Sequence, residues 1–338
     1  MKNVSVFIVA LMSILTLGCQ TKEQMVAPVT TFEGQLSVSK WGYPKFSNRI
    51  GDFQTIETIN GDMYVKDFGN SDLAFLKNIK TINGDLEISE SEITNLDFLS
   101  SLETVNGRIS ININKNLSSL TGFEKLKKAK GFVLYGNFPT VIPIDLIPIQ
   151  NIALSETLVL KFLANDTFPF FKNINSLSNA LIIEHCKVKN LNCLSNLAVA
   201  ANIIILRNDL LQNLEGLSRI TSVGDIFVGN ILLETLKGLD NLKTITGIFN
   251  ISSIALKSVS NLRSVSSVES LVLSDTKCDN LDGLENLLAC KKLLIYNNLQ
   301  LANLCALKPL VIADNAVEWR VFGNLQNPTI EDIKINCQ

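Results

Sequence analysis

The chain has 338 residues, of which 46% are hydrophobic, 18% charged and 7% aromatic, and its formal net charge is −2. This apolar fraction excludes a disordered chain, although the charged fraction lies below the about 25% of an ordinary domain. The balanced charge excludes the basic footprint of a nucleic-acid-binding protein and a polybasic membrane patch. The single histidine, His185, excludes a His-rich metal site and leaves any His-dependent catalysis to one residue.

Residues 1–18 have the pattern of a secretory signal peptide. The apolar run at 4–17 is shorter than the ~20 residues that a membrane-spanning helix needs. The following Gly18-Cys19 resembles a bacterial lipobox, although Thr16 stands where a lipobox favours Leu. The resemblance implies that Cys19 is lipidated and that 19–31 form a tether, so we expect an outer-membrane lipoprotein, anchored at this end only and exposed at the cell surface. The alternative is cleavage by an ordinary signal peptidase, or an anchor that is not removed.

A repeat fills residues 32–338. Short alternating strand patterns follow a glycine at 61–65, 84–88 and 107–111, and similar strands recur every 22 or 23 residues through most of the chain. Between strands, an apolar residue at every third position favours a 3-10 or irregular return path over an α-helix. We therefore predict a repeat solenoid instead of two domains. It is a right-handed parallel β-helix of about twelve or thirteen turns with short strands and one continuous core.

The repeat resembles the leucine-rich-repeat superfamily, and more closely the receptor L-domain of the insulin and epidermal growth factor receptor ectodomains. The residues that carry this resemblance are INGDMYV at 59–65, INGDLEI at 82–88 and VNGRISI at 105–111. The Asn that such repeats place just after the strand is present at Asn114, Asn137 and Asn208. The tail at 324–337 resembles the end cap of surface lipoproteins with such repeats in Bacteroidetes-type bacteria. The resemblance implies a fold and specifies no function.

Prolines and cysteines mark special places in the repeat. Three prolines near 138–150 predict an irregular turn that kinks the rod, because proline cannot continue a ladder strand. Apart from Cys19 there are six cysteines, which allow 15 pairings in an oxidising compartment. Cys305 and Cys337 bracket the final turn and are the candidate disulfide, closing a C-terminal cap over 305–338. The other four are open to pairing or to a role as buried thiols.

The outward position of each predicted strand lies one residue before its last apolar residue. This position is mostly polar in the first turns and apolar in the middle turns, which predicts a binding surface on the sheet face. Alternatively, another segment covers this stripe, or the register is displaced by one residue. The candidate binding residues, including neighbouring outward positions, are Tyr64, Val133, Tyr135, Val159, Ile182, Ile204, Leu206, Phe227, Val272 and Ile295.

Catalytic motifs are weak in this sequence. Asp62 and Asp85 occupy equivalent places in adjacent turns, as in polysaccharide-active β-helix enzymes, but each follows a glycine in a turn that favours Asp. His185 and Cys186 are strand neighbours and should point to opposite faces. We expect no catalytic residues, metal or cofactor, and a monomeric, non-enzymatic adhesion module that binds an unknown protein or glycan and no nucleic acid. The alternatives are a polysaccharide-active enzyme and an envelope scaffold.

Overall fold

The computed structural model describes residues 29–39, 53–136, 143–313 and 317–337. Its elements in chain order are β1 (Thr31–Glu33), β2 (Leu36–Ser39), β3 (Thr58–Asn60), β4 (Met63–Lys66), η2 (Asn70–Leu76), β5 (Thr81–Ile82), β6 (Leu86–Ser89), η3 (Asp97–Leu99), β7 (Thr104–Val105), β8 (Arg108–Asn112), β9 (Lys128–Tyr135), η4 (Ile147–Ile149), β10 (Ala153–Lys161), β11 (Ser176–Glu184), η5 (Asn192–Leu194), β12 (Val199–Leu206), η6 (Glu215–Leu217), β13 (Ser222–Val223), β14 (Asp225–Gly229), β15 (Thr244–Ser252), η7 (Ser260–Leu262), β16 (Ser267–Ser274), β17 (Ala289–Tyr296), η8 (Cys305–Leu307), α2 (Lys308–Ile312), β18 (Glu318–Phe322) and α3 (Ile330–Asn336).

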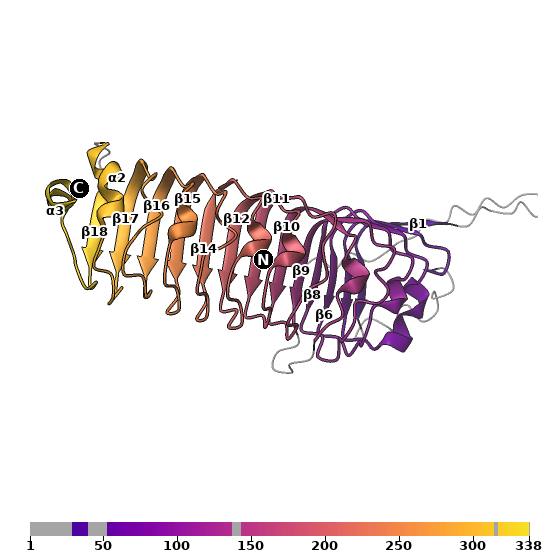
Figure 1. Ribbon diagram of the computed structural model, residues 1–338. Helices are drawn as coiled ribbons and strands as arrows, with labels where there is room; N and C mark the ends of the chain where they lie inside the picture. The colour runs from indigo at the N-terminus through magenta and orange to yellow at the C-terminus, as the bar shows by residue number, and fades with distance from the viewer. Residues whose placement is uncertain (1–28, 40–52, 137–142, 314–316, 338) are drawn as a thin grey trace, which may run out of the picture.

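The described strands form one parallel sheet of 18 strands, and successive turns stack along a rod (Figure 1). Equivalent residues of neighbouring turns pair directly, as Val65 does with Ile88 and Ile205 with Val228. The prediction of short parallel strands in a repeat fold is confirmed at this level. Among the described residues, no helix combines the length and the apolar character that a membrane crossing requires.

The return paths are short, and most contain a single 3-10 turn. In η3 the apolar residues Phe98 and Leu99 point into the core, and η5 and η6 bury Leu194 and Leu217 in the same way. Because a 3-10 turn places every third residue on one side, a period of three, as in the buried Leu96, Leu99 and Leu102, keeps the core residues facing the strands. One continuous core therefore runs between the sheet and the return paths along the rod.

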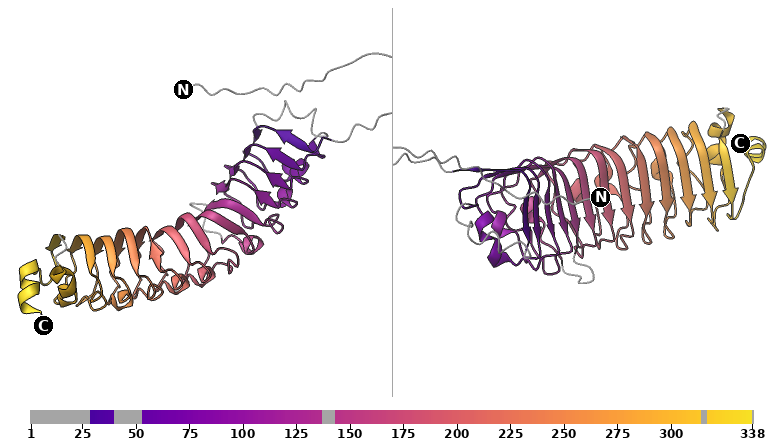
Figure 2. Two further views of the ribbon diagram at one scale, coloured as in Figure 1. Left: turned by 90° about the horizontal axis from the view of Figure 1, so that it is seen from above. Right: turned by 180° about the vertical axis from the view of Figure 1, so that it is seen from behind.

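The rod bends near its middle, and the sheet lines the concave side of the bend (Figure 2). The predicted irregular turn near 138–150 lies at this part of the chain, and residues 137–142 are outside the described residues. Beyond them, η4 follows a bridge between Ser119 and Asp145. The sheet continues across this segment, since β9 pairs with β10 through Val133 and Val159, with a register irregularity after Leu154.

A ladder of buried side chains fastens the corner that follows each strand. Asn208 is fully buried, its Nδ2 donates to the Ile183 carbonyl at 2.9 Å, and its Oδ1 accepts from the Cys186 amide at 3.0 Å. Asn230 in the next turn accepts from the Asn208 amide at 2.7 Å. Asn114 and Asn298 make equivalent bonds in their own turns. The expected Asn114 and Asn208 therefore hold adjacent turns together, and Asn137 lies outside the described residues.

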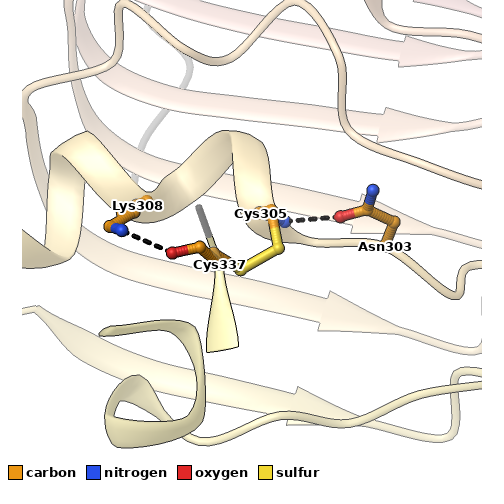
Figure 3. Close-up of a disulfide and its surroundings, with 4 residues drawn as sticks. All are labelled: Asn303, Cys305, Lys308 and Cys337. Carbon is orange, nitrogen blue, oxygen red and sulfur yellow. Dashed lines mark hydrogen bonds between the residues drawn. A yellow bond between two sulfur atoms is a disulfide. The ribbon is translucent and has the colours of Figure 1, made fainter. Parts of the chain in front are cut away.

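The C-terminal end of the core is closed by α2, α3 and a disulfide (Figure 3). Cys305 and Cys337 are bonded with a Cα–Cα distance of 5.3 Å, which confirms the predicted pair. Lys308 Nζ donates to the Cys337 carbonyl, and the Cys305 amide donates to Asn303 Oδ1 at 2.8 Å. Thr329 caps α3 through a reciprocal bond pair with Asp332. The free cysteines among the described residues, at 186, 193, 278 and 290, are all buried.

Candidate functional site

The concave sheet face carries a central column of outward side chains, one from each turn. Strand pairing aligns Val133 with Val159, Val159 with Ile182, and so on through the stack, so the column follows directly from the register. From the N-terminal turn to the C-terminal turn its members are Ser37, Tyr64, Glu87, Ser110, Val133, Val159, Ile182, Ile204, Phe227, Asn250, Val272, Leu294 and Arg320.

The predicted binding residue Ile295 does not belong to this column. It is fully buried in the core and pairs with Leu273 and Val321, and Leu294 takes the outward place. The prediction failed because 293–296 form an unbroken apolar run, in which a shift of one residue leaves both faces apolar. The ladder residue Asn298 carried the missing signal: Asn208 lies three residues after the core residue Ile205, and the same spacing leads from Asn298 to Ile295.

The apolar centre of the column runs over five consecutive turns, from Val133 to Phe227. Four of these side chains are half-buried, whereas Val159 is only 6% exposed. Val159 therefore points outward, but it offers little area to a partner, which corrects its place among the candidate contacts. Neighbouring outward side chains stand ~4.8 Å apart in a parallel sheet and cover one another's flanks. Val133, Ile182, Ile204 and Phe227 consequently provide the accessible part of the surface.

A second outward column, one residue after the core position, flanks the first. It holds the predicted residues Tyr135 and Leu206, both half-buried, with Lys161 and Glu184 between them. Lys161 Nζ lies 2.8 Å from Glu184 Oε2 and 5.7 Å from the centre of the Tyr135 ring. Since both charged side chains are only about one-fifth exposed, this pair forms a fixed polar border beside the apolar column.

His185 stands at the edge of this border in a left-handed backbone conformation, with φ 55°. Its ring stacks on Phe162 at 4.7 Å, and its Nε2 lies 3.3 Å from Arg207 Nη1. Cys186 points into the core, where burial raises the pKa of its thiol to about 12. A thiol that stays protonated and faces away from the imidazole cannot act with it as a nucleophile pair.

The carboxylates Asp62 and Asp85 bind backbone amides of the following turn. Asp62 Oδ1 accepts from the Asp85 amide at 2.8 Å, and Asp85 Oδ1 accepts from the Arg108 amide at 2.7 Å. Asp225 does the same for Ile248 at 2.8 Å, so these residues tie adjacent turns together as the turn pattern indicated. The second oxygen of Asp62 accepts from the hydroxyl of Tyr64 at 3.3 Å. Burial, followed by the Asp62 charge, raises the pKa of that hydroxyl.

The sheet face has a second apolar part near the C-terminal cap. Leu294 and Val272 are adjacent in the central column, and Tyr296 stacks on Phe322 at 5.4 Å in the flanking column. Tyr296 and Leu294 were not predicted as contacts, because of the register error at β17. Asn250 separates this part from Phe227 in the central column.

Neither comparison with known proteins found a relative. No protein-family model matches the chain, and no curated protein matches its sequence. Within the described ranges, no group of three or more His, Cys, Asp or Glu residues is arranged to hold a metal ion. The predicted lipidation site, Cys19, lies outside the described residues.

Proposed function

We propose that the chain is a non-enzymatic cell-envelope lipoprotein that binds another protein through its concave sheet face. The observation that carries this proposal is the apolar centre of the outward column, where Val133, Ile182, Ile204 and Phe227 occupy the concave side of a rigid rod. Contiguous outward apolar side chains of this extent are typical of interaction surfaces. Rigid presentation lowers the entropy lost on binding.

The chemistry of this face favours a protein partner over a glycan. Its accessible centre is largely aliphatic, with Ile182 and Ile204 beside Phe227, and aliphatic side chains offer a sugar neither a stacking platform nor hydrogen bonds. The paired charges of Lys161 and Glu184 supply the polar border that commonly surrounds the apolar core of a protein interface. We therefore expect the partner to present an apolar patch of its own, with polar groups that meet this border.

Two further features support the rest of the proposal. The lipobox-like Gly18-Cys19 supports a lipid anchor at the outer membrane, facing the cell exterior. The ladder of Asn114, Asn208 and Asn298 supports assignment of the repeat to a leucine-rich-repeat type similar to the receptor L-domain.

The enzymatic alternative is disfavoured by the bonds of the aspartates. One carboxylate oxygen of Asp62 and one of Asp85 already accept a backbone amide from the next turn. A general acid or base in a glycosidase needs its carboxyl group free to exchange a proton with the substrate.

The proposal is tested by comparing the partners that three forms of the full chain capture when displayed on intact cells. The double variant Ile204→Lys/Phe227→Lys places two charges on the concave face, whereas the control Ile147→Lys alters an exposed residue of a return path. A partner protein that binds the parent and the control with equal affinity, and binds the double variant at least tenfold more weakly, supports the proposal. Circular dichroism checks that the double variant is folded.

Three other results would overturn it. If captured proteins bind all three forms equally, the concave face is not the binding surface. If the parent retains only glycans in an array of oligosaccharides and no protein, the partner class is wrong. If the parent releases reducing sugars from a polysaccharide and the Asp62→Asn variant does not, the chain is an enzyme.

A further inference from the structure

Three planar side chains follow one another at the corner that borders the concave sheet face. Phe162, His185 and Arg207 occupy the same place in consecutive turns, one residue after the flanking column, with φ of 57°, 55° and 56°. The rings of Phe162 and His185 stack with their centres 4.7 Å apart, and His185 Nε2 lies 3.3 Å from Arg207 Nη1. The series therefore ends on a guanidinium group.

The imidazole of His185 is the hydrogen-bond acceptor in this arrangement. A guanidinium group only donates hydrogen bonds, so the contact requires a lone pair on Nε2 and hence a neutral ring. Stacking on Phe162 fixes the plane of the ring, and the ring in turn holds one arm of the guanidinium. The other arm and Nε of Arg207 make no hydrogen bond to the residues that the structure describes, so they are available to a ligand.

The charge of Arg207 is also uncompensated. Glu184, in the preceding turn, is bound by Lys161 at 2.8 Å, so this pair neutralises itself. Asp209 follows two residues after Arg207 in the chain, yet Arg207 takes part in no ion pair with any described side chain. A positioned cation without an acid of its own favours an anionic group on the partner.

The repeat has no equivalent of Arg207 in the following turn. Asn208 comes three residues after the core residue Ile205, whereas Asn230 comes only two residues after the core residue Val228. The corner after β14 is therefore one residue shorter, and the residue that it lacks is the one in the place of Arg207. The guanidinium is consequently the last member of its series on the side of the C-terminal turns.

Arg207 borders the apolar centre of the concave face. It lies three residues after Ile204, so about 10 Å of extended backbone separates the two residues. Gly229, which pairs with Leu206 in the next turn, brings no side chain to this border. An interface of ordinary size, about 800 Å² on each partner, covers the apolar centre and Arg207 together.

We propose that Arg207 anchors a carboxylate of the protein partner, an aspartate or a glutamate beside the partner's apolar patch, and that His185 is a positioning residue for the guanidinium. This inference rests on the proposed function, because the apolar patch of the same partner would cover Ile204 and Phe227. The free arm and Nε of a guanidinium match the two oxygens of a carboxylate, which a lysine does not. Arginine is also among the residues that most often carry the binding energy of a protein interface.

The probe for this proposal is a displayed library of random peptides, selected on the full parent chain. Peptides that also bind the Ile204→Lys/Phe227→Lys variant are discarded, so those retained need the concave face. Each retained peptide is then measured against the parent, against Arg207→Glu and against the control Arg219→Glu. Arg219 is an exposed arginine of the return path in the same turn, and it likewise forms no ion pair with a described residue.

We expect the retained peptides to carry an Asp or a Glu and to bind Arg207→Glu about tenfold more weakly or worse, with Arg219→Glu equal to the parent. Exchanging that acid for Lys in the peptide should restore binding to Arg207→Glu, which a merely structural role of Arg207 would not produce. His185→Phe keeps a ring stacked on Phe162 and removes the acceptor. It should weaken the acidic peptide and leave its Asn or Gln counterpart unchanged.

The failures of the two proposals are distinguishable. Peptides that need the concave face but bind Arg207→Glu as tightly as the parent would overturn the carboxylate anchor and leave the proposed function standing. A loss on Arg207→Glu that the Lys-containing peptide does not reverse would also overturn the anchor. Equal effects of His185→Phe on the acidic peptide and its amide counterpart would overturn the positioning role. If the selection yields no peptide that needs the concave face, both proposals fall.

Discussion

Replacing Asn208 with Ala should weaken the stack more than any exposed Asn substitution. The side chain is fully buried and bonds the Ile183 carbonyl and the Cys186 amide, so the variant leaves two buried backbone groups without partners. Each buried unpaired group costs about 1–3 kcal/mol, which gives an expected loss of roughly 2–6 kcal/mol in the free energy of unfolding. The comparison variant is Asn241→Ala, which removes one exposed bond to the Ser218 carbonyl.

The assay is urea unfolding followed by circular dichroism, together with hydrogen exchange at the Cys186 amide. We expect Asn241→Ala to cost at most about 1 kcal/mol, since water replaces the lost partner. The Cys186 amide should exchange its hydrogen faster in Asn208→Ala than in the parent. In Asn241→Ala its exchange rate should equal that of the parent. Equal losses of stability in the two variants, with the Cys186 amide still protected in both, would refute the role assigned to the ladder.

Three further predictions concern the cap, a turn and the thiols. Cys305→Ser removes a cross-link between residues 32 positions apart. We expect the free energy of unfolding in urea to fall by about 3 kcal/mol and proteolysis after β18 to become faster. An unchanged urea midpoint would contradict this. Gly238 has φ +109°, and a Cβ there would clash with a backbone carbonyl. Gly238→Ala should therefore lower the free energy of unfolding, measured by thermal unfolding, by more than ~1 kcal/mol. Gly69→Ala is the control and should be nearly neutral. Burial raises the pKa of Cys186 and Cys193 to about 12, so about one thiol in 10⁴ is ionised at pH 8 and iodoacetamide should modify them only after unfolding. Their contribution to stability is complete below the ordinary thiol pKa and is lost as the pH rises toward 12, and modification of the folded chain at pH 8 would contradict their burial.

The sequence alone determined the repeat, the direction of its strands and the form of its return paths. Strand residues alternate with period two and return-path residues recur with period three, and local backbone geometry sets both periods. The buried Asn at the corner and the Cys305–Cys337 pair were also predictable, because each occupies a fixed place relative to its turn.

The tertiary structure decided everything that depends on what the neighbouring turns present. The run at 293–296 has no polar residue to distinguish its faces, so only pairing with Leu273 and Val321 shows that Ile295 is core and Leu294 is outward. The low exposure of Val159 and the high exposure of Ile231 likewise depend on side chains one turn away. The exposed fraction of a side chain depends on the neighbouring turns of the stack, so the sequence of a single repeat does not determine it.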